Sequence, residues 1–340
     1  MIDKEVERIR EWHGKPYHSL DSYCKNTYGE KIYKIAIDAG MTCPNRDGTL
    51  DTRGCIFCSA GGSGDFAVRS DLVTGNTIQA QIAKGKELFS GRTANGKQLH
   101  PKKTGCRFIA YFQSYTNTYA PLYYLRELFH AALSDTSVIG ISIGTRPDCI
   151  SKDICSLLNL LRQEFPSKFI WIELGLQTIH ESTASYIRRG YSLSCFEACL
   201  QHLHRYDIPV IVHVILGLPG ETRTMMLDTV SYLNTCQIQG IKLQLLHILK
   251  GTDLSYDYQN NAFSAMSMDC YIDIVISCLE ILSPDIVIHR VTGDGPKNLL
   301  ISPLWSSDKR KVLNTLHQEM KLRNTWQGSA YYDSRCNYNL

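Results

Sequence analysis

The chain has 340 residues, 44% of them hydrophobic and 20% charged, and its formal net charge is +3. This balance is typical of a folded globular protein and excludes a disordered chain, and the small net charge gives no global field that favours nucleic acid. The N-terminal stretch MIDKEVERIREWHG lacks the apolar core of a secretion signal, and no run approaches the roughly 18 apolar residues of a membrane span. We therefore expect a cytoplasmic protein with no membrane partner.

Short β-branched runs recur along the chain, and segments with helical spacing separate them. Each run has the length and composition of a buried strand. The segments between them carry apolar residues three or four apart, such as Ile78 and Ile82, which predicts amphipathic helices. The predicted strands cover residues 31–38, 107–112, 138–144, 168–174, 209–216 and 241–249.

Six consecutive βα units allow two architectures. Parallel strands joined by right-handed crossovers form either an open doubly wound sheet or a barrel. Polar, turn-rich loops follow all six strands, and barrel enzymes gather their chemistry in the loops after the strands. We therefore predict an α/β fold, a partial (βα)6 barrel of TIM type with a C-terminal α/β extension.

Three further elements are predicted after the sixth unit. They are an apolar helix at about 266–282, a strand at 285–293 and a basic amphipathic helix near 308–323. They either extend the sheet or cover the open edge of the barrel. The predicted division of the chain is an N-terminal segment 1–30, a barrel core 31–255 and a C-terminal extension 256–340.

The loop after the first strand, MTCPNRDGTLDTRGCIFCSAGG, holds Cys43, Cys55 and Cys58. Its Gly, Pro, Asn and Asp content excludes a regular helix or strand. A structural zinc site would need a fourth ligand, for which Cys24 or His18 is the candidate. A redox Cys-x-x-Cys pair would leave Cys43 unexplained. Three thiolates at the mouth of a barrel suit an iron–sulfur cluster with one iron open to another ligand.

The same loop, with Phe57 before the last cysteine, resembles the motif of the radical S-adenosylmethionine (SAM) superfamily. The first two cysteines, Cys43 and Cys55, are farther apart in the sequence than is common in that superfamily. A bacterial group related to the catalytic subunit of Elongator shares this departure, and the chain resembles that group in CPNRDGT, FQSYTNTY, GTRPD, ELGLQT and GLPGET. The resemblance implies that Cys43, Cys55 and Cys58 hold a [4Fe–4S] cluster whose open iron binds SAM. One electron then cleaves SAM to a 5′-deoxyadenosyl radical, which removes a hydrogen atom from the substrate.

The resemblance also implies SAM-binding residues in other loops. After the second strand the family usually has Gly-Gly-Glu, whereas this chain has Gln113 and Ser114, which bring no carboxylate to the amino group of SAM. Arg146 is matched to the cofactor's carboxylate, although a structural role is the alternative. The other matched positions are Glu173 and Gln177, against ribose and carboxylate, and Ile215, against adenine. For Glu173 the alternative is a buried acid whose hydrogen bonds are satisfied within the protein. No catalytic residue is assigned.

The Elongator resemblance implies a tRNA substrate with a modified wobble uridine, and the bacterial group is similar to enzymes that remodel a carboxymethylaminomethyl group at its 5-position. Residues 84–107, with seven Lys or Arg and one Glu, and residues 309–323 are candidate phosphate contacts. We expect tRNA and a reductant such as flavodoxin or ferredoxin as partners, with the oligomeric state open. The alternatives are a peptide or small metabolite in the same barrel, or a metal-stabilised RNA-binding module. Tyrosines available for base stacking are Tyr115, Tyr119, Tyr331 and Tyr332.

The remaining cysteines and two histidines are predicted to be ordinary core residues or have no assigned role. The chain has an odd number of cysteines, thirteen, many in apolar helical patterns, so reduced thiols are expected. His213 and His247 lie on predicted strands and are expected to be hydrogen-bonded core histidines. Predicted buried cysteines are Cys155, Cys195, Cys199 and Cys278, and unassigned ones are Cys24, Cys106, Cys149 and Cys336.

Overall fold

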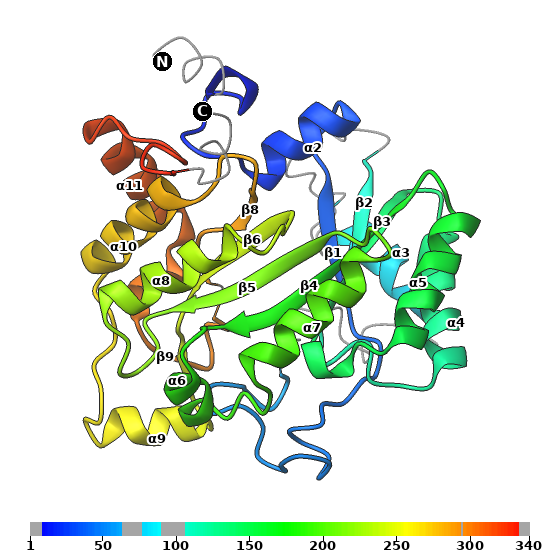
Figure 1. The fold of residues 1–340 in the computed structure, drawn as a ribbon, viewed down its shortest axis with the longest axis horizontal. Helices are drawn as coiled ribbons and strands as arrows, with labels where there is room; N and C mark the ends of the chain where they lie inside the picture. Colours follow the sequence, from blue (N-terminus) through cyan, green and yellow to red (C-terminus); the bar gives the residue numbers. More distant parts are fainter. Residues whose placement is uncertain (1–8, 63–76, 90–105, 294, 333–340) are drawn as a thin grey trace, which may run out of the picture.

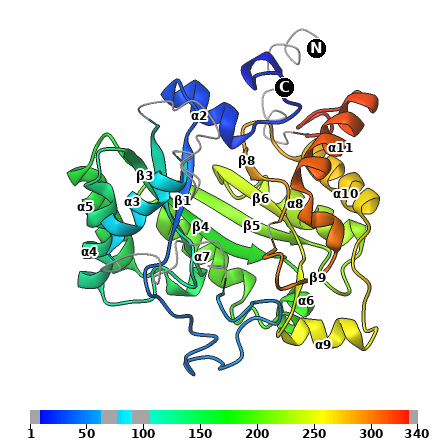
Figure 2. The same ribbon diagram turned by 180° about the vertical axis from the view of Figure 1, so that it is seen from behind.

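The computed structural model describes residues 9–62, 77–89, 106–293 and 295–332. Within these ranges, seven parallel strands form one sheet whose strand order follows the chain. Figures 1 and 2 show that the sheet curls into a half-barrel with helices along its outer face. The strands are β1 (Tyr33–Ile37), β2 (Phe108–Phe112), β3 (Val138–Thr145), β4 (Phe169–Gln177), β5 (Val210–Leu216), β6 (Gly240–Leu245) and β8 (Val287–Arg290).

Helices join successive strands and cover the convex side of the sheet (Figure 1). Several begin at a Ser or Thr whose side chain accepts a hydrogen bond from the first helical turn, as Ser151 does from the backbone N–H of Ile154. The covering helices are α3 (Ile78–Phe89), α4 (Leu122–Leu133), α5 (Lys152–Glu164), α7 (Leu193–His204), α8 (Arg223–Leu233) and α10 (Met268–Ile281). The remaining helices are α2 (Leu20–Tyr28), η2 (Pro147–Cys149), α6 (Glu181–Tyr186), α9 (Asp253–Gln259), η3 (Leu304–Ser307) and α11 (Lys309–Leu322).

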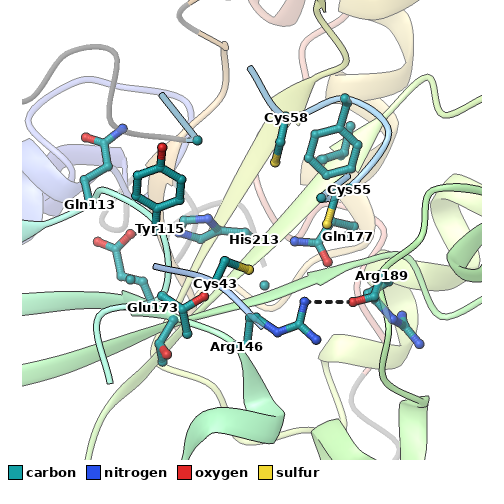
Figure 3. A pocket seen from close by; sticks show the side chains of 18 of the residues that line it. Cys43, Cys55, Cys58, Gln113, Tyr115, Arg146, Glu173, Gln177, Arg189 and His213 are labelled. Atoms are coloured by element: carbon teal, nitrogen blue, oxygen red, sulfur yellow. Dashed lines mark hydrogen bonds and ion pairs between the residues drawn. The ribbon is translucent and has the colours of Figure 1, made fainter. Parts of the chain in front are cut away.

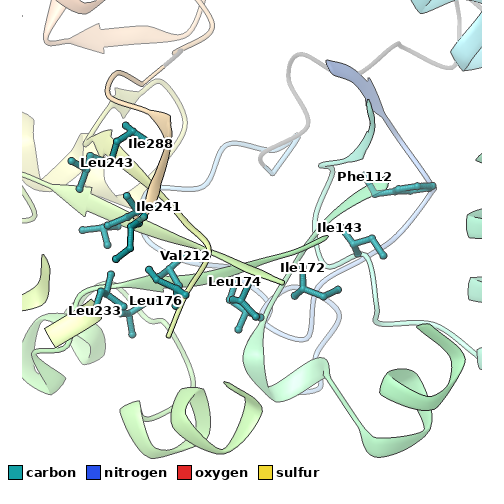
Figure 4. Packing of buried hydrophobic residues seen from close by; sticks show 14 of the residues in the cluster. Phe112, Ile143, Ile172, Leu174, Leu176, Val212, Leu233, Ile241, Leu243 and Ile288 are labelled. Atoms are coloured by element: carbon teal, nitrogen blue, oxygen red, sulfur yellow. The ribbon is translucent and has the colours of Figure 1, made fainter. Parts of the chain in front are cut away.

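The main hydrophobic core lies between the sheet and these helices. Figure 4 shows part of it, with Ile143, Ile172 and Val212 from adjacent strands. Every residue of β2 and β3 is buried, which is expected for parallel strands covered on both faces. The side chains on the outer face of the sheet therefore stabilise the fold, and those on its inner face line the inside of the barrel.

The inside of the barrel is closed at the amino ends of the strands by a second apolar cluster, here named the plug. It consists of Ile109, Ile139, Trp171 and Ile211. The ring of Trp171 stacks on that of Phe169 with centroids 3.9 Å apart. Side chains of α2 pack against the plug, and Ser19, just before α2, bridges to Ile288 of β8. The barrel is thus filled from below and open at the carboxyl ends of its strands.

The predicted strands are confirmed, with one correction at the sixth. The chain leaves the sheet after Leu245, and β7 (Ile248–Leu249) pairs antiparallel with β9 (Leu300–Ser302). The prediction of one strand over 241–249 was wrong because the apolar run continues through this break. The strand predicted at 285–293 is shorter, and as β8 it extends the sheet. The proposed division of the chain stays a prediction, although its boundary at 255/256 falls within α9.

Three of the four cysteines predicted to be buried are buried, namely Cys155, Cys199 and Cys278. Cys195 is partly exposed, so its prediction was wrong. It lies in the first turn of α7, one position away from Phe196, which belongs to the apolar face of that helix. Across the described ranges, no helix has both the length and the apolar character that a membrane crossing requires.

Candidate functional site

A pocket opens at the carboxyl ends of the strands, and the cysteine loop forms part of its wall. Cys43, Cys55 and Cys58 all line it. Figure 3 shows their sulfur atoms around the same space as the side chains of Gln177 and Arg146. The three cysteines that the sequence singled out therefore come together at the mouth of the barrel.

The backbone of the cysteine loop is held in shape by its own hydrogen bonds. The backbone N–H of Arg46 donates to Cys43 O (2.8 Å) and that of Cys58 to Cys55 O (3.0 Å). The Arg46 guanidinium donates to the carbonyls of Cys58 (3.0 Å) and Ser59 (2.6 Å). Gly54 has φ +77°, and a Cβ there would lie 2.8 Å from Arg46 Nε. Arg46 thus ties the two halves of the loop together, and this contact requires glycine at position 54.

Donors near the sulfur atoms favour the thiolate form at one cysteine. A hydrogen bond from the Cys58 thiol and the nearby Arg146 lower the pKa of Cys55 to about 7, against the opposing effect of burial. Asn45 Nδ2 also donates to Cys55 Sγ at 3.4 Å. The same Cys55–Cys58 contact, together with burial, raises the pKa of Cys58. Because metal ligation needs thiolates, this environment fits a positively charged metal group.

The zinc interpretation is not supported by the positions of its candidate fourth ligands. Cys24 is buried on α2, and His18 stacks on Trp12 beside the same helix. Neither belongs to the residues that line the pocket. In the described part of the chain, no three His, Cys, Asp or Glu side chains are arranged to hold a single metal ion. Three thiols spread around a pocket suit the wider iron–sulfur cluster better than one tetrahedral ion.

Arg146 lines the pocket, but much of its guanidinium is already engaged. Nε and Nη2 donate to the two carboxylate oxygens of Asp148 at 2.9 and 2.7 Å, and Nη1 donates to Arg189 O at 3.1 Å. The group lies 4.9 Å from the centroid of the Tyr191 ring. Gly190 is packed so closely that a Cβ would lie 2.7 Å from Asn45 Oδ1. Arg146 therefore links the segment after β3 to the chain after β4, and Asn45 of the cysteine loop donates to the same segment at Arg188 O (2.8 Å).

Gln177 reaches the pocket because β4 bends at its end. The pairing of β4 with β5 shifts register between Gly175 and Gln177, and Gln177 has φ +64°. The Tyr191 hydroxyl donates to Gly175 O (2.5 Å) and to Gln177 Oε1 (3.2 Å). A Cβ at position 175 would lie 2.5 Å from Gln177 Nε2, so Gly175 makes room for this side chain.

The structure brings most of the predicted SAM-binding residues to the pocket. Ser114 is buried and does not line the pocket. Of the two residues predicted after β2, Gln113 is therefore the one that does. The assigned SAM contacts themselves remain predictions. The predicted residues that line the pocket are Gln113, Arg146, Glu173, Gln177 and Ile215.

A group of charged side chains, here named the charged layer, lies deeper in the barrel and consists of Lys34, Glu173, His213 and Lys242. Glu173 is fully buried. Its Oε1 accepts from Lys34 Nζ (2.9 Å) and Ser142 Oγ (2.6 Å). Its Oε2 accepts from Lys242 Nζ and from His213 Nε2 (2.7 Å). Glu173 is therefore the centre of a closed hydrogen-bond network.

The charged layer shifts the protonation of its members. Burial works against the carboxylate, but Lys242 and Lys34 hold the pKa of Glu173 well below its usual range. Burial lowers the pKa of His213 to about 4, so its imidazole is neutral at physiological pH. Burial also lowers the pKa of Lys242 to about 7, although Glu173 opposes this. His213 is thus hydrogen-bonded as predicted, and so is His247, whose Nε2 lies 3.1 Å from Ser306 Oγ. Neither is a core residue, because both are half-buried and His213 lines the pocket.

Several residues of the pocket and of the charged layer were missed at the level of sequence. Lys34 and Lys242 each interrupt a run of apolar residues in a strand, in KIYKIAID and IKLQLL, and that interruption was the available signal. Arg189 is buried and donates to the carbonyls of Leu176, Thr178 and Tyr191, and no pattern in the sequence marked it.

Comparison with known proteins relates the chain to one family. Residues 52–233 match the model of the radical SAM superfamily, and residues 238–322 match that of the radical SAM C-terminal domain. The chain is 40% identical over 317 residues to the uncharacterized protein YtqA of Bacillus subtilis (strain 168), a match that covers 93% of both chains. It is 24% identical over 309 residues to Elongator complex protein 3 of Danio rerio, over 82% of this chain and 55% of that protein.

A solved structure is similar in fold. The archaeal Methanocaldococcus infernus Elp3 with an N-terminal deletion aligns over 87% of this chain and 64% of its own, with a TM-score of 0.60 and 14% sequence identity. The likeness shows that the two chains share the half-barrel architecture.

Proposed function

The chain belongs to the radical SAM superfamily, and on that premise we propose that it remodels a carboxymethylaminomethyl-type 5-substituent on a wobble uridine of tRNA. Enzymes of this family bind a [4Fe–4S] cluster and SAM. The proposal is carried by one observation. Three thiols and a set of polar side chains converge at the open end of a half-barrel, in a chain related to Elongator complex protein 3.

Cys43, Cys55 and Cys58 would hold the cluster, because they are the thiols that line the pocket. When bound, the two cofactors supply a carbon radical that removes a hydrogen atom from the substrate. Arg146 and Gln177 lie beside the thiols and offer polar groups to the methionine part of SAM (Figure 3).

Glu173 takes a different role from the one that the resemblance implies. Both of its carboxylate oxygens already accept hydrogen bonds from the chain's own donors. We therefore propose that it positions Lys242 and His213 and does not contact ribose directly. Ile215, which lines the pocket with Phe57 and Ile187, keeps the role of an apolar contact for adenine. These apolar side chains also exclude water from the place where the radical acts.

The tRNA part of the proposal rests on family resemblance and on exposed basic residues. Arg310 and Lys311 are exposed at the start of α11, where they can contact phosphates. Much of the other basic stretch, residues 90–105, lies outside the described residues, as does Cys336. Tyr115 lines the pocket, where an extruded base has an aromatic face to stack on.

Mass spectrometry of tRNA nucleosides from cells lacking this protein tests the substrate directly. We expect the nucleoside with the carboxymethylaminomethyl group to accumulate and its remodelled form to disappear. The wild-type gene should restore the profile, whereas a Cys58→Ala variant should not. An unchanged profile in the deletion strain would reject tRNA and favour a peptide or small metabolite in the same pocket.

A further inference from the structure

The charged layer lies deeper in the barrel than Gln177 and the three cysteines. Lys34 is the second residue of β1 and Lys242 the third of β6, whereas Gln177 and the cysteines lie at or beyond the ends of their strands. The plug fills the barrel below this layer. The layer therefore forms the floor of the pocket, opposite the cysteines. Figure 3 shows Glu173 and His213 in this pocket with the three cysteines.

Lys242 has one hydrogen-bond donor more than the residues described in the structure use. An ammonium group carries three N–H donors. Lys242 Nζ donates to Glu173 Oε2 and to the Tyr111 hydroxyl, the latter at 3.1 Å. The residue is buried and lines the pocket. Its third donor is therefore left for a group that enters the pocket, and a buried donor without an acceptor costs free energy.

The charges around Lys242 favour an anion as that group. Among the described residues that line the pocket, Glu173 is the single carboxylate, against five basic side chains. Arg290 is the partner of Lys242 in the register of β6 and β8, and it lines the same pocket. Burial, together with the like charges of Lys34 and Arg290, lowers the pKa of Lys242 to about 7 against the attraction of Glu173. Glu173 is thus the carboxylate that faces the cations Lys34, Lys242 and Arg290. These cations would stabilise a second negative charge beside Lys242.

A second hollow reaches the same ammonium from the side of the barrel. It is lined by Lys34, Tyr111, Lys242 and Arg290, and it lies at the two edge strands β1 and β8. The floor of the pocket is thus approached from two directions.

We propose that Lys242, supported by Arg290, binds a carboxylate of the substrate at the floor of the pocket and thereby selects substrates that carry one. This inference deepens the proposed function, because a carboxymethylaminomethyl group ends in a carboxylate. The ammonium donates its third N–H to the carboxylate, and Glu173 holds it in place. Besides burial, the charges of Glu173 on β4, Lys34 on β1 and Arg290 on β8 set the charge state of Lys242. The other titratable groups near it are Tyr111 on β2, His213 on β5 and His289 on β8.

Isothermal titration calorimetry on the enzyme loaded with cluster and SAM tests this contact. The first two probes are the nucleoside 5-carboxymethylaminomethyluridine and its methyl ester, which differ in charge at one group. We expect the acid to bind roughly 10- to 100-fold more tightly than the ester, as for a charge-assisted hydrogen bond. Lys242→Met should bring this ratio close to one. Lys152→Met, which changes an exposed lysine on α5, should leave it unchanged.

Proton uptake gives a second readout with acetate as the probe. Since a bound carboxylate raises the pKa of Lys242, binding near pH 8 should take up protons in the wild type and in Lys152→Met, and none in Lys242→Met. SAM affinity measured for each variant shows whether the pocket is still folded. Lys242→Arg, which keeps the charge, should retain most of the preference for the acid.

The outcomes separate this inference from the proposed function. It is wrong if the acid binds no better than the ester, or if the preference survives in Lys242→Met. If neither nucleoside binds, acetate decides: uptake that depends on Lys242 supports the carboxylate site and speaks against the wobble-uridine substrate, and no uptake overturns the site. An altered tRNA profile in the deletion strain, with no preference for the acid, would leave the proposed function standing and reject the carboxylate contact.

Discussion

The plug and the charged layer occupy successive levels of the same barrel, yet their chemistry is opposite. Trp171 and Glu173 lie two residues apart on β4, and both are fully buried. Trp171 packs among apolar side chains of the plug, whereas Glu173 is surrounded by two ammonium groups and an imidazole. A large aromatic side chain stabilises the fold through its buried area. A buried charge network does so much less, because removing charges from water offsets their attraction. The lower level thus serves stability, and the upper level is where we propose that a carboxylate of the substrate binds.

The largest expected effect of a mutation is on cofactor binding by the cysteine loop, which lies above both levels of the barrel. Replacing Cys58 with Ala removes a ligand of the proposed cluster, so iron content and release of 5′-deoxyadenosine should fall to background. Unfolding of the cluster-free protein should change by less than about 1 kcal/mol, since Cys58 is only partly buried. Anaerobic reconstitution followed by ultraviolet–visible spectroscopy and iron analysis measures this. Cys270→Ala, at an exposed position, is the control. A coloured, iron-loaded Cys58→Ala protein would contradict the assignment.

A change in the plug should destabilise the protein without touching the chemistry. Trp171→Ala leaves a cavity beside Phe169 and Tyr23, and we expect it to lower the free energy of unfolding by roughly 3–5 kcal/mol. Urea denaturation measures the loss. Leu160→Ala, at a position with 59% exposure, should change stability by less than about 0.5 kcal/mol. If the folded Trp171→Ala enzyme binds SAM normally, the two levels are independent; weaker SAM binding would show that they are coupled.

Glu173→Gln probes the charged layer with little change in shape. It leaves Lys34 and Lys242 without their shared carboxylate, and we expect a loss of about 3 kcal/mol in the free energy of unfolding. The matched control is Glu87→Gln, which weakens an exposed pair with Lys84 and should cost less than about 1 kcal/mol. Equal small effects in both variants would mean that the charged layer is solvated.

The smallest expected effect is a dependence of stability on pH that traces to Lys242. Its pKa is about 7 in the folded protein, below the ordinary value of 10.5, so between these values the unfolded chain binds the proton that the folded protein releases. The stability of the wild type relative to Lys242→Met should therefore rise by about 1 kcal/mol from pH 7 to pH 8. Urea denaturation of both proteins across this range measures it. A difference that stays constant with pH would show that Lys242 titrates normally.

The fold was more predictable from the sequence than the site. Buried parallel strands such as β3 are continuous apolar runs, and the helices between them carry a regular apolar face. The break after Leu245 was not predictable, because Leu246 leaves the sheet while keeping a backbone hydrogen bond to Leu216. Apolar composition alone does not reveal such a departure.

At the site, local motifs identified the cysteines, and the remaining residues depend on contacts across the chain. Cys43, Cys55 and Cys58 share one loop and could be found together. Lys34 and Lys242 are far apart in the sequence and meet at the carboxylate of Glu173 and the ring of Tyr111. A lysine within a strand points either to solvent or into the barrel, and the sequence does not distinguish the two cases.

The strand order of the sheet has a consequence for how the protein forms. Each strand from β1 to β6 lies beside its predecessor, so every βα unit can dock on a surface that has already left the ribosome. The closing contacts join distant parts of the chain: the backbone N–H of His18 donates to Gln327 Oε1 (2.9 Å), and that of Gln327 donates to Pro16 O (2.9 Å). We expect the backbone amides of His18 and Gln327 to be the last to acquire protection in pulsed hydrogen exchange during refolding. Early protection there would mean that assembly does not follow the direction of synthesis.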